Sequence, residues 1–384
     1  MEVEKSSTEI NANEKYKESL PTGNNLTKIL LIGVIAIAAL LALILGLVIG
    51  LKKNKKKFNR INKVKTDIVN SYNNTDELSQ KYPVENPTKI KEGLEERIQN
   101  RLLTGFENWN RGFKAWKAWG NILYTEDSIY NVHGARLSLP EYQKSMDATL
   151  KQTKIYMGNF HNMLINDNFT AIYYDIITTY GEKNVSGTVM EFVQFKDYED
   201  NLGTRVVEGW GGTKDQSYNS MIQFQEESER KVQKEQNEYM LNYTIPDKDN
   251  LREKYPIKFP SEYIDQQKAD QMLDIILNGF DSWNQGFENY SNWVNESYND
   301  DAKSVGLKGK ERNITEYLEE MDELLKKYKI EKLYFDNVLI RDNWAALHYR
   351  YRNTTFGTNI TEVGDRMQFL QFGENLKINN SWIK

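Results

Sequence analysis

The strongest constraint on the fold of this 384-residue chain is an internal repeat. Residues 105–113 read GFENWNRGF, and residues 279–287 read GFDSWNQGF. Chance does not hold many such matches at an almost constant spacing, so the sequence predicts two tandem domains of one fold. We call residues 81–213 the first repeat and residues 254–384 the second repeat. Further matches pair 160–168 with 335–343, and 190–195 with 367–372.

Each repeat has the sequence pattern of helices followed by strands. In the first repeat, apolar residues recur every three or four positions over residues 89–119, which predicts a helix. Pro140 suits the first turn of a second helix that ends near Lys151. Helices before an antiparallel meander indicate an α+β fold in which a curved antiparallel sheet wraps the helices. Four stretches rich in β-branched and aromatic residues predict the strands, at 156–165, 169–180, 185–196 and 204–212.

An apolar segment precedes the repeats. Residues 29–51 are all Ile, Leu, Val, Ala or Gly, and as a helix they match the ~30 Å hydrocarbon layer of a membrane. We therefore expect a single transmembrane helix that contacts lipid, and a C-terminal part held in the cytoplasm by the positive-inside rule, because lysines cluster directly after it. The remaining segments are a polar tail at 1–28, a basic stalk at 52–80 and a polar connector at 214–253.

Composition narrows the chemistry. The chain has no cysteine and three histidines, so it has no thiolate nucleophile, and we expect neither a metal site nor a cofactor. The net charge of −5 provides no overall basic field, which argues against nucleic-acid binding.

The repeats resemble a known family. An opening helix with aromatic residues such as Trp109, a first strand region with Asp127, a helix led by Pro140 and four long strands are similar to the SnoaL-like branch of the NTF2-like superfamily. The resemblance implies a cone-shaped α+β domain around one pocket, a small hydrophobic ligand and homodimers that form through the sheet face. It implies no single activity, because the superfamily includes cyclases, isomerases and non-catalytic binding modules.

Three residues of the first repeat are candidate catalytic groups: Asp127, His133 and Asp175. The His133 imidazole could transfer protons near pH 7, or it could simply bond a loop carbonyl. Tyr173 and Asp175 share one face of a strand. If that face is concave, a carboxylate beside a phenol could act as base and donor; otherwise Asp175 is a solvated strand residue. The second repeat has Asp301 at the position of Asp127. A structural role in a turn or helix cap explains this repeated aspartate as well as a catalytic role does.

The candidate ligand-binding residues are His161, Tyr173 and Glu191 in the first repeat and His348 and Arg350 in the second. The arginine would suit an anionic ligand if its strand face points inward, and would be an exposed residue if it points outward. The acid/base set is not duplicated between the repeats. The positions of His161, Tyr173, Asp175 and Glu191 hold Asp336, His348, Arg350 and Gln368.

This loss of acid/base residues favours a membrane-anchored, non-catalytic module that binds a small ligand or a protein partner. The alternative is a SnoaL-like cyclase or a ketosteroid-isomerase type of enzyme that uses the first repeat.

Overall fold

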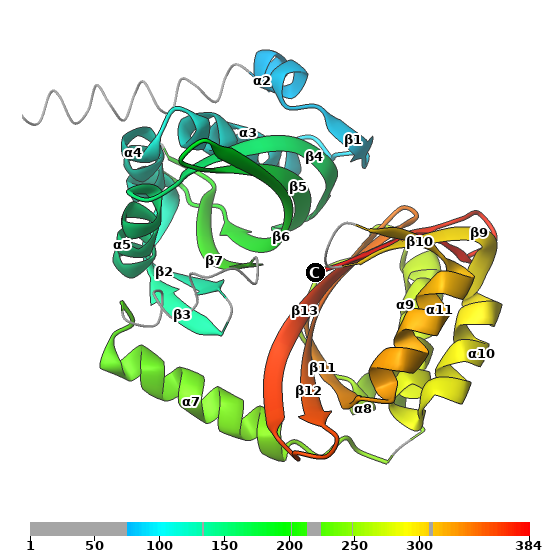
Figure 1. The fold of residues 1–384 in the computed structure, drawn as a ribbon. Coiled ribbons are helices and arrows are strands. Elements are labelled where there is room, and N and C mark those ends of the chain that lie inside the picture. Colours follow the sequence, from blue (N-terminus) through cyan, green and yellow to red (C-terminus); the bar gives the residue numbers. More distant parts are fainter. Residues whose placement is uncertain (1–74, 133, 201, 213–223, 248, 307–309) are drawn as a thin grey trace, which may run out of the picture. The chain divides into compact units, whose positions relative to one another are not determined.

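The computed structural model describes residues 75–384 except 133, 201, 213–223, 248 and 307–309, and these residues belong to one compact unit that contains two seven-stranded sheets (Figure 1). The helix α2 (Thr75–Lys81) leads into the first repeat. That repeat contains β1 (Val84–Pro87), α3 (Leu94–Asn110), α4 (Phe113–Leu123), β2 (Tyr124–Val132), β3 (Ala135–Ser138), α5 (Leu139–Leu150), β4 (Lys154–Asn166), β5 (Phe169–Tyr180), β6 (Lys183–Lys196) and β7 (Arg205–Gly212).

A connector helix, α7 (Glu227–Asn242), precedes the second repeat. The short helix α8 (Leu251–Lys254) leads into that repeat. The second repeat contains β8 (Ile257–Pro260), α9 (Gln266–Gln285), α10 (Phe287–Ser297), β9 (Tyr298–Val305), β10 (Glu311–Asn313), α11 (Ile314–Leu325), β11 (Tyr328–Arg341), β12 (Trp344–Thr355), β13 (Thr361–Phe372) and β14 (Ile378–Ile383).

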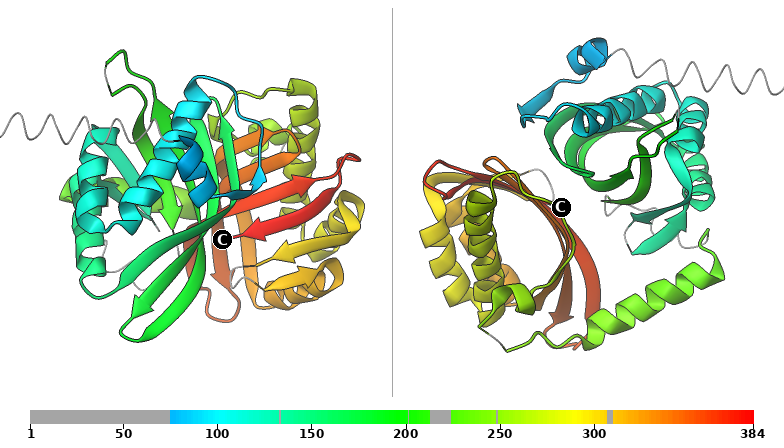
Figure 2. Two further views of the ribbon diagram at one scale, coloured as in Figure 1. Left: turned by 90° about the horizontal axis from the view of Figure 1, so that it is seen from above. Right: turned by 180° about the vertical axis from the view of Figure 1, so that it is seen from behind.

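The two sheets have the same topology. The strand order is β1-β4-β5-β6-β7-β2-β3 in one sheet and β8-β11-β12-β13-β14-β9-β10 in the other. In each sheet the long strands curve around the helices of the same repeat, as the three views show (Figures 1 and 2). The internal repeat of the sequence is therefore a repeat of the entire fold.

The fold-class prediction needs two corrections. The sheets are mixed rather than antiparallel, because β1 pairs with β4, and β2 with β7, in parallel, and the second repeat does the same. The transmembrane helix is without support: no helix in the described part of the chain is long and apolar enough to cross a membrane, and residues 29–51 lie outside that part. Cytoplasmic placement, lipid contact and homodimer formation stay sequence-based predictions.

Local sequence explains where the elements begin and end. The predicted helix over 89–119 is two helices, because Gly112 at φ 105° ends α3 and starts α4 at an angle that other residues rarely adopt. The helix α5 starts at a capping box in which Ser138 and Glu141 satisfy each other's backbone N–H groups. The hairpin between β4 and β5 turns at Asp167, which takes the left-handed φ of 53° that Asp tolerates.

The faces of β5 alternate between two environments. Ile172 and Tyr174 point to the concave side, where they pack with Leu102 and Phe106 of α3. Ala171 lies on the opposite, outer face of the sheet. The core of the first repeat thus lies between α3 and the concave face of its sheet.

The outer faces of the two sheets pack against each other. Ala171 and Phe192 of the first repeat share one apolar cluster with Ala346 and Phe369, their counterparts in the second repeat. Ring contacts are reciprocal as well: Phe192 stacks on His348 at 5.8 Å between centroids, and Tyr173, the counterpart of His348, lies 6.2 Å from Phe369. Contacts that are exchanged between equivalent residues are typical of a two-fold interface. The chain therefore contains a pseudo-dimer of its two repeats.

Hydrogen bonds at the edge of this interface are also exchanged between equivalent residues, with one difference. The Asn166 side chain donates to the Ile340 carbonyl at 3.0 Å, and its counterpart Arg341 donates to the Ile165 carbonyl at 2.7 Å. Arg341 also forms a buried ion pair with Glu95 of α3, at 2.6 Å. The second repeat thus contributes an ion pair to the interface, and the first repeat has no equivalent one because Asn166 is uncharged.

Candidate functional site

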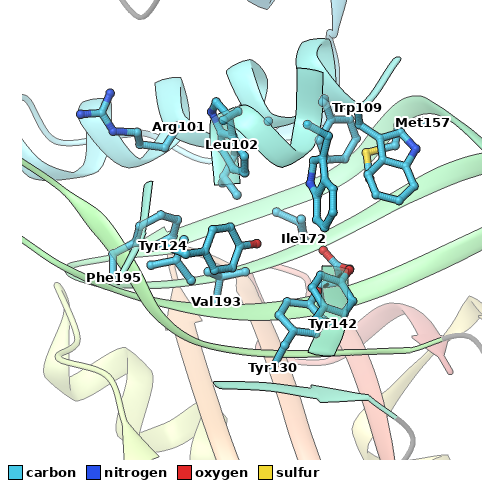
Figure 3. A pocket seen from close by; sticks show the side chains of 16 residues that line it. Arg101, Leu102, Trp109, Tyr124, Tyr130, Tyr142, Met157, Ile172, Val193 and Phe195 are labelled. Atoms are coloured by element: carbon cyan, nitrogen blue, oxygen red, sulfur yellow. Dashed lines mark hydrogen bonds between the residues drawn. The ribbon is translucent and has the colours of Figure 1, made fainter. Parts of the chain in front are cut away.

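The first repeat encloses a cavity of about 60 Å³ between its helices and the concave face of its sheet. In Figure 3, Leu102 and Trp109 of α3 face Tyr124 and Val193 of the sheet across this cavity. The lining is mainly aromatic and aliphatic. It comprises Arg101, Leu102, Gly105, Phe106, Trp109, Trp116, Trp119, Tyr124, Tyr130, Tyr142, Met157, Ile172, Glu191, Val193, Phe195 and Val206.

Glu191 of β6 is the acidic group of the lining. The Tyr130 hydroxyl donates a hydrogen bond of 2.7 Å to its Oε1. Desolvation raises the pKa of Glu191, and hydrogen bonds from Tyr130 and Tyr174 offset only part of that rise. The residue is densely surrounded by protein yet only half-buried, because part of its surface borders the cavity. The site therefore presents a carboxyl group with a raised pKa to an apolar space.

Two glycines give Tyr130 its position. Tyr130 stacks on Tyr142 of α5 with ring centroids 4.3 Å apart, and its ring lies over β7. A Cβ atom at Gly209 would come within 2.4 Å of that ring, and one at Gly211 within 2.9 Å of the hydroxyl oxygen. Any side chain at these glycines would displace Tyr130 and with it the hydrogen bond to Glu191.

Trp119 supplies a second polar group. Its ring covers Gly105, where a Cβ atom would lie 2.9 Å from the indole, and its Nε1 is buried without a hydrogen-bond partner among the described atoms. A buried N–H without a partner costs free energy that a ligand acceptor would recover. Arg101 is different, because its guanidinium donates to the carbonyls of Leu202 and Thr204.

Of the candidate catalytic residues that the structure describes, Asp127 and Asp175, neither lines this cavity. Asp127 is exposed on β2, where a hydrogen bond with the Thr125 side chain lowers its pKa. His133 lies outside the described residues. Tyr173 and Asp175 are on the outer face of β5, so the face that they share is not the concave one. Of the seven candidates that the structure describes, Glu191 alone lines the cavity.

On the outer face of the first repeat, His161 lies between two acids. Its Nδ1 is 2.7 Å from Glu85, and its Nε2 is 2.8 Å from Asp175. Partial burial lowers the pKa of His161, but the hydrogen bonds with the two carboxylates outweigh it and raise the pKa above the ordinary value. Tyr173 packs beside this group, with its ring 4.8 Å from the imidazole.

The second repeat inverts these charges. Asp336, the counterpart of His161, is paired with Lys258 at 3.2 Å and with Arg350. His348 is fully buried beside them, with its Nε2 2.8 Å from Asp365. An acid between two bases therefore replaces a histidine between two acids. The charge partners of His161 and of Asp336 come from strands of the same sheet. Both clusters therefore stabilise the outer face of their sheet and do not form a ligand pocket.

Sequence reasoning missed the residues that complete the cavity. Trp109, Trp116 and Trp119 recur at helical spacing, which is typical of core residues, and they do pack in one buried cluster. Such spacing does not identify the indole N–H of Trp119, which is buried without a partner among the described atoms. Tyr130 was not singled out. The available indication was Gly209-Trp210-Gly211 in a predicted strand, because glycines at alternate positions leave one strand face open to a neighbouring ring.

The known proteins that are similar to this chain are solved structures that match about a third of it. No protein-family model and no curated protein sequence matches the chain. Three solved structures are similar to parts of it. A protein from Jannaschia sp. CCS1 described as a SnoaL-like polyketide cyclase is 11% identical over 30% of this chain and 85% of that chain, with a TM-score of 0.28. AclR from Streptomyces galilaeus, described as a hydroxylase, is 18% identical over 35% of this chain and 100% of that chain, with a TM-score of 0.27. An NTF2-like protein of unknown function from Burkholderia pseudomallei is 9% identical over 30% of this chain and 89% of that chain, with a TM-score of 0.27.

Proposed function

We propose that the first repeat binds a small, mainly apolar molecule that carries one polar group. The observation that supports this most directly is the half-buried Glu191 carboxyl group, which accepts a hydrogen bond from Tyr130 and borders an aromatic cavity. Apolar walls with a few placed polar groups are typical of ligand sites. A ligand hydroxyl could donate to Glu191, and a ligand oxygen could accept from the Trp119 indole N–H.

The cavity volume limits the ligand. About 60 Å³ is less than the roughly 150 Å³ that holds benzene in an engineered protein cavity, so binding of a ring requires a side chain to move. Met157 lines the cavity and is unbranched, which makes it the side chain best able to move aside. The ligand is therefore one small ring or a short chain rather than a large polycycle.

An isomerase-type reaction is the second candidate function. A phenol beside a carboxyl group with a raised pKa, in an apolar cavity, can stabilise an enolate oxygen, as in the ketosteroid isomerases. That chemistry also needs a general base at the substrate. Glu191 is the single carboxylate among the described lining residues, and as a hydrogen-bond donor it cannot also be the base. This shortage favours binding over catalysis.

The experiment uses the purified chain with phenol and 2-cyclohexen-1-one as probes, followed by calorimetry and thermal melts. A probe at 100 times its dissociation constant should stabilise the protein by roughly 2.7 kcal/mol. Glu191→Gln keeps the shape of the side chain and should weaken phenol binding at least ~tenfold. Asp175→Asn, on the outer face, is the control and should leave binding unchanged.

Equal probe affinities for wild type and Glu191→Gln would refute the proposed site, as would a complete lack of binding. Isomerisation of 3-cyclohexen-1-one to its conjugated isomer, followed by absorbance, tests the second candidate. Turnover that disappears in Glu191→Gln would establish the enzyme in place of the binding module.

A further inference from the structure

The interior of the second repeat contains an amine where the first repeat has a thioether. Lys332 of β11 is the counterpart of Met157, because each residue sits at a bulge and exchanges two backbone hydrogen bonds with an equivalent side chain, Asn284 or Asn110. Met157 lines the cavity of the first repeat. The fold thus directs the Lys332 side chain into the corresponding space of the second repeat.

Four aromatic rings surround the Lys332 Nζ. It lies 4.5 Å from the centroid of Phe280, 4.8 Å from Trp283, 5.5 Å from Tyr349 and 5.6 Å from Tyr290. Among the described residues, no carboxylate pairs with it. A buried ammonium without a counter-ion is costly, so desolvation lowers the pKa of Lys332 to about 7.

Two other lysines of the described residues have anionic partners, although desolvation lowers the pKa of one of them, Lys258, as well. Lys258 lies 3.2 Å from Asp336, and Lys254 is paired with Asp281, so both ammonium groups have an anionic partner. Lys332 is nevertheless not sealed from solvent, because the residue is half-buried rather than buried. Amines that are desolvated in apolar surroundings and still accessible are the nucleophiles that form Schiff bases.

We propose that Lys332 is a carbonyl-reactive site, at which the Nζ amine forms a reversible imine with small aldehydes or ketones. In this step the Nζ lone pair attacks the carbonyl carbon to give a carbinolamine. The carbonyl oxygen then takes up two protons, both ultimately from the amine nitrogen, and leaves as water while the C=N bond forms. No oxidant or reductant is needed, and the apolar cage disfavours the return of water. This site does not depend on the ligand proposed for the first repeat.

The test is reductive trapping of the whole chain at pH 7 with propanal and sodium cyanoborohydride, followed by peptide mapping against time. At this pH the neutral fraction of an amine with a pKa near 7 is about a thousandfold larger than that of an ordinary lysine. The rate advantage is smaller than this ratio, because a less basic amine is a weaker nucleophile and the surrounding rings narrow the approach of the aldehyde. We expect Lys332 to be propylated at least ~tenfold faster than the ion-paired Lys258.

Lys332→Met is the matched variant, because methionine is the residue of the first repeat at this position. The fast adduct should disappear in this variant, while the slow modification of other lysines continues. Peptide mapping of the wild-type chain decides the matter even if the variant folds poorly. Propylation of Lys332 no faster than that of Lys258, or a fast adduct that persists in Lys332→Met, would overturn the proposal.

Discussion

The two repeats have the same fold, but the ionisable group in the interior is an acid in the first repeat and a base in the second. The first repeat places an acid, Glu191, beside Tyr130, and the second places Gln368 and Ser304 at these positions. The register of the strands confirms the equivalence, because Ile172 pairs with Glu191 as Leu347 pairs with Gln368. The second repeat instead places a base, Lys332, where the first has Met157.

This difference explains why no acid/base pair is duplicated. An acid and a base in contact would form an ion pair, whereas in separate repeats each has a pKa shifted by desolvation. The tandem arrangement therefore permits two sites of different reactivity within one pseudo-dimer. The comparison makes a prediction about variants that remove a difference between the repeats. Each should change the stability, its pH dependence or the ligand binding that depends on one repeat, and leave the properties of the other repeat unchanged.

The largest expected effect concerns Arg341, which breaks the symmetry of the interface between the repeats. Arg341→Asn gives the second repeat the residue that the first has at Asn166. The Glu95 carboxylate would then stay buried with only the backbone N–H groups of Lys91 and Asp167 as donors. We expect a loss of ~3–5 kcal/mol in the free energy of unfolding, measured by urea denaturation.

The control for this variant is Arg97→Asn. Arg97 pairs with Asp197 at 2.7 Å, but both side chains are 45% exposed, so the variant should cost less than ~1 kcal/mol. If Arg341→Asn costs no more than this control, the buried ion pair does not hold the repeats together.

The second effect is a pH dependence at Lys332. The folded chain has released this proton above about pH 7, and the unfolded chain keeps it up to about pH 10.4, so wild-type stability rises with pH between these values. Lys332→Met removes the slope. At pH 6 the variant should be more stable than wild type by ~2 kcal/mol, since desolvation costs up to ~4 kcal/mol and ring attraction offsets part of that.

Lys329→Met is the matched control, because Lys329 is on the same strand but 60% exposed. It should leave the pH slope unchanged. Parallel stability curves for wild type and Lys332→Met from pH 6 to pH 10 would show that the Lys332 pKa is not lowered.

The sequence predicted the elements of each repeat better than their faces. Helix and strand positions follow from local periodicity, and the long strands lie where the pattern placed them. The side of β5 that is concave is set by tertiary packing, so alternation grouped Tyr173 with Asp175 but could not show that both lie outside the cavity. The short strands β1 and β8 were missed because parallel pairing at a sheet edge leaves almost no local pattern.

The site was harder to predict for the same reason. Glu191 is a candidate from the sequence because it is an ionisable residue on a predicted strand, which is a local feature. Tyr130 and Lys332 acquire their surroundings from residues far along the chain: Glu191 for the first, and rings from α9, α10 and β12 for the second. No spacing rule within a single segment can identify such groups.

The smallest effect concerns Gly209, which makes room for Tyr130. In Gly209→Ala the new methyl group would lie 2.4 Å from a buried ring that is itself stacked on Tyr142, so the ring or the strand must shift. Overpacking of this kind costs ~1–2 kcal/mol in the free energy of unfolding. Because the shift moves the Tyr130 hydroxyl away from Glu191, phenol binding to the first repeat should weaken while the reactivity of Lys332 stays unchanged.

Gly187→Ala provides the comparison on the same sheet, since a Cβ atom there would meet Ile176 at 3.6 Å, an ordinary contact. It should leave stability within ~0.5 kcal/mol of wild type and leave phenol binding intact. If Gly209→Ala behaves like Gly187→Ala in both measurements, Tyr130 does not depend on the open face of β7.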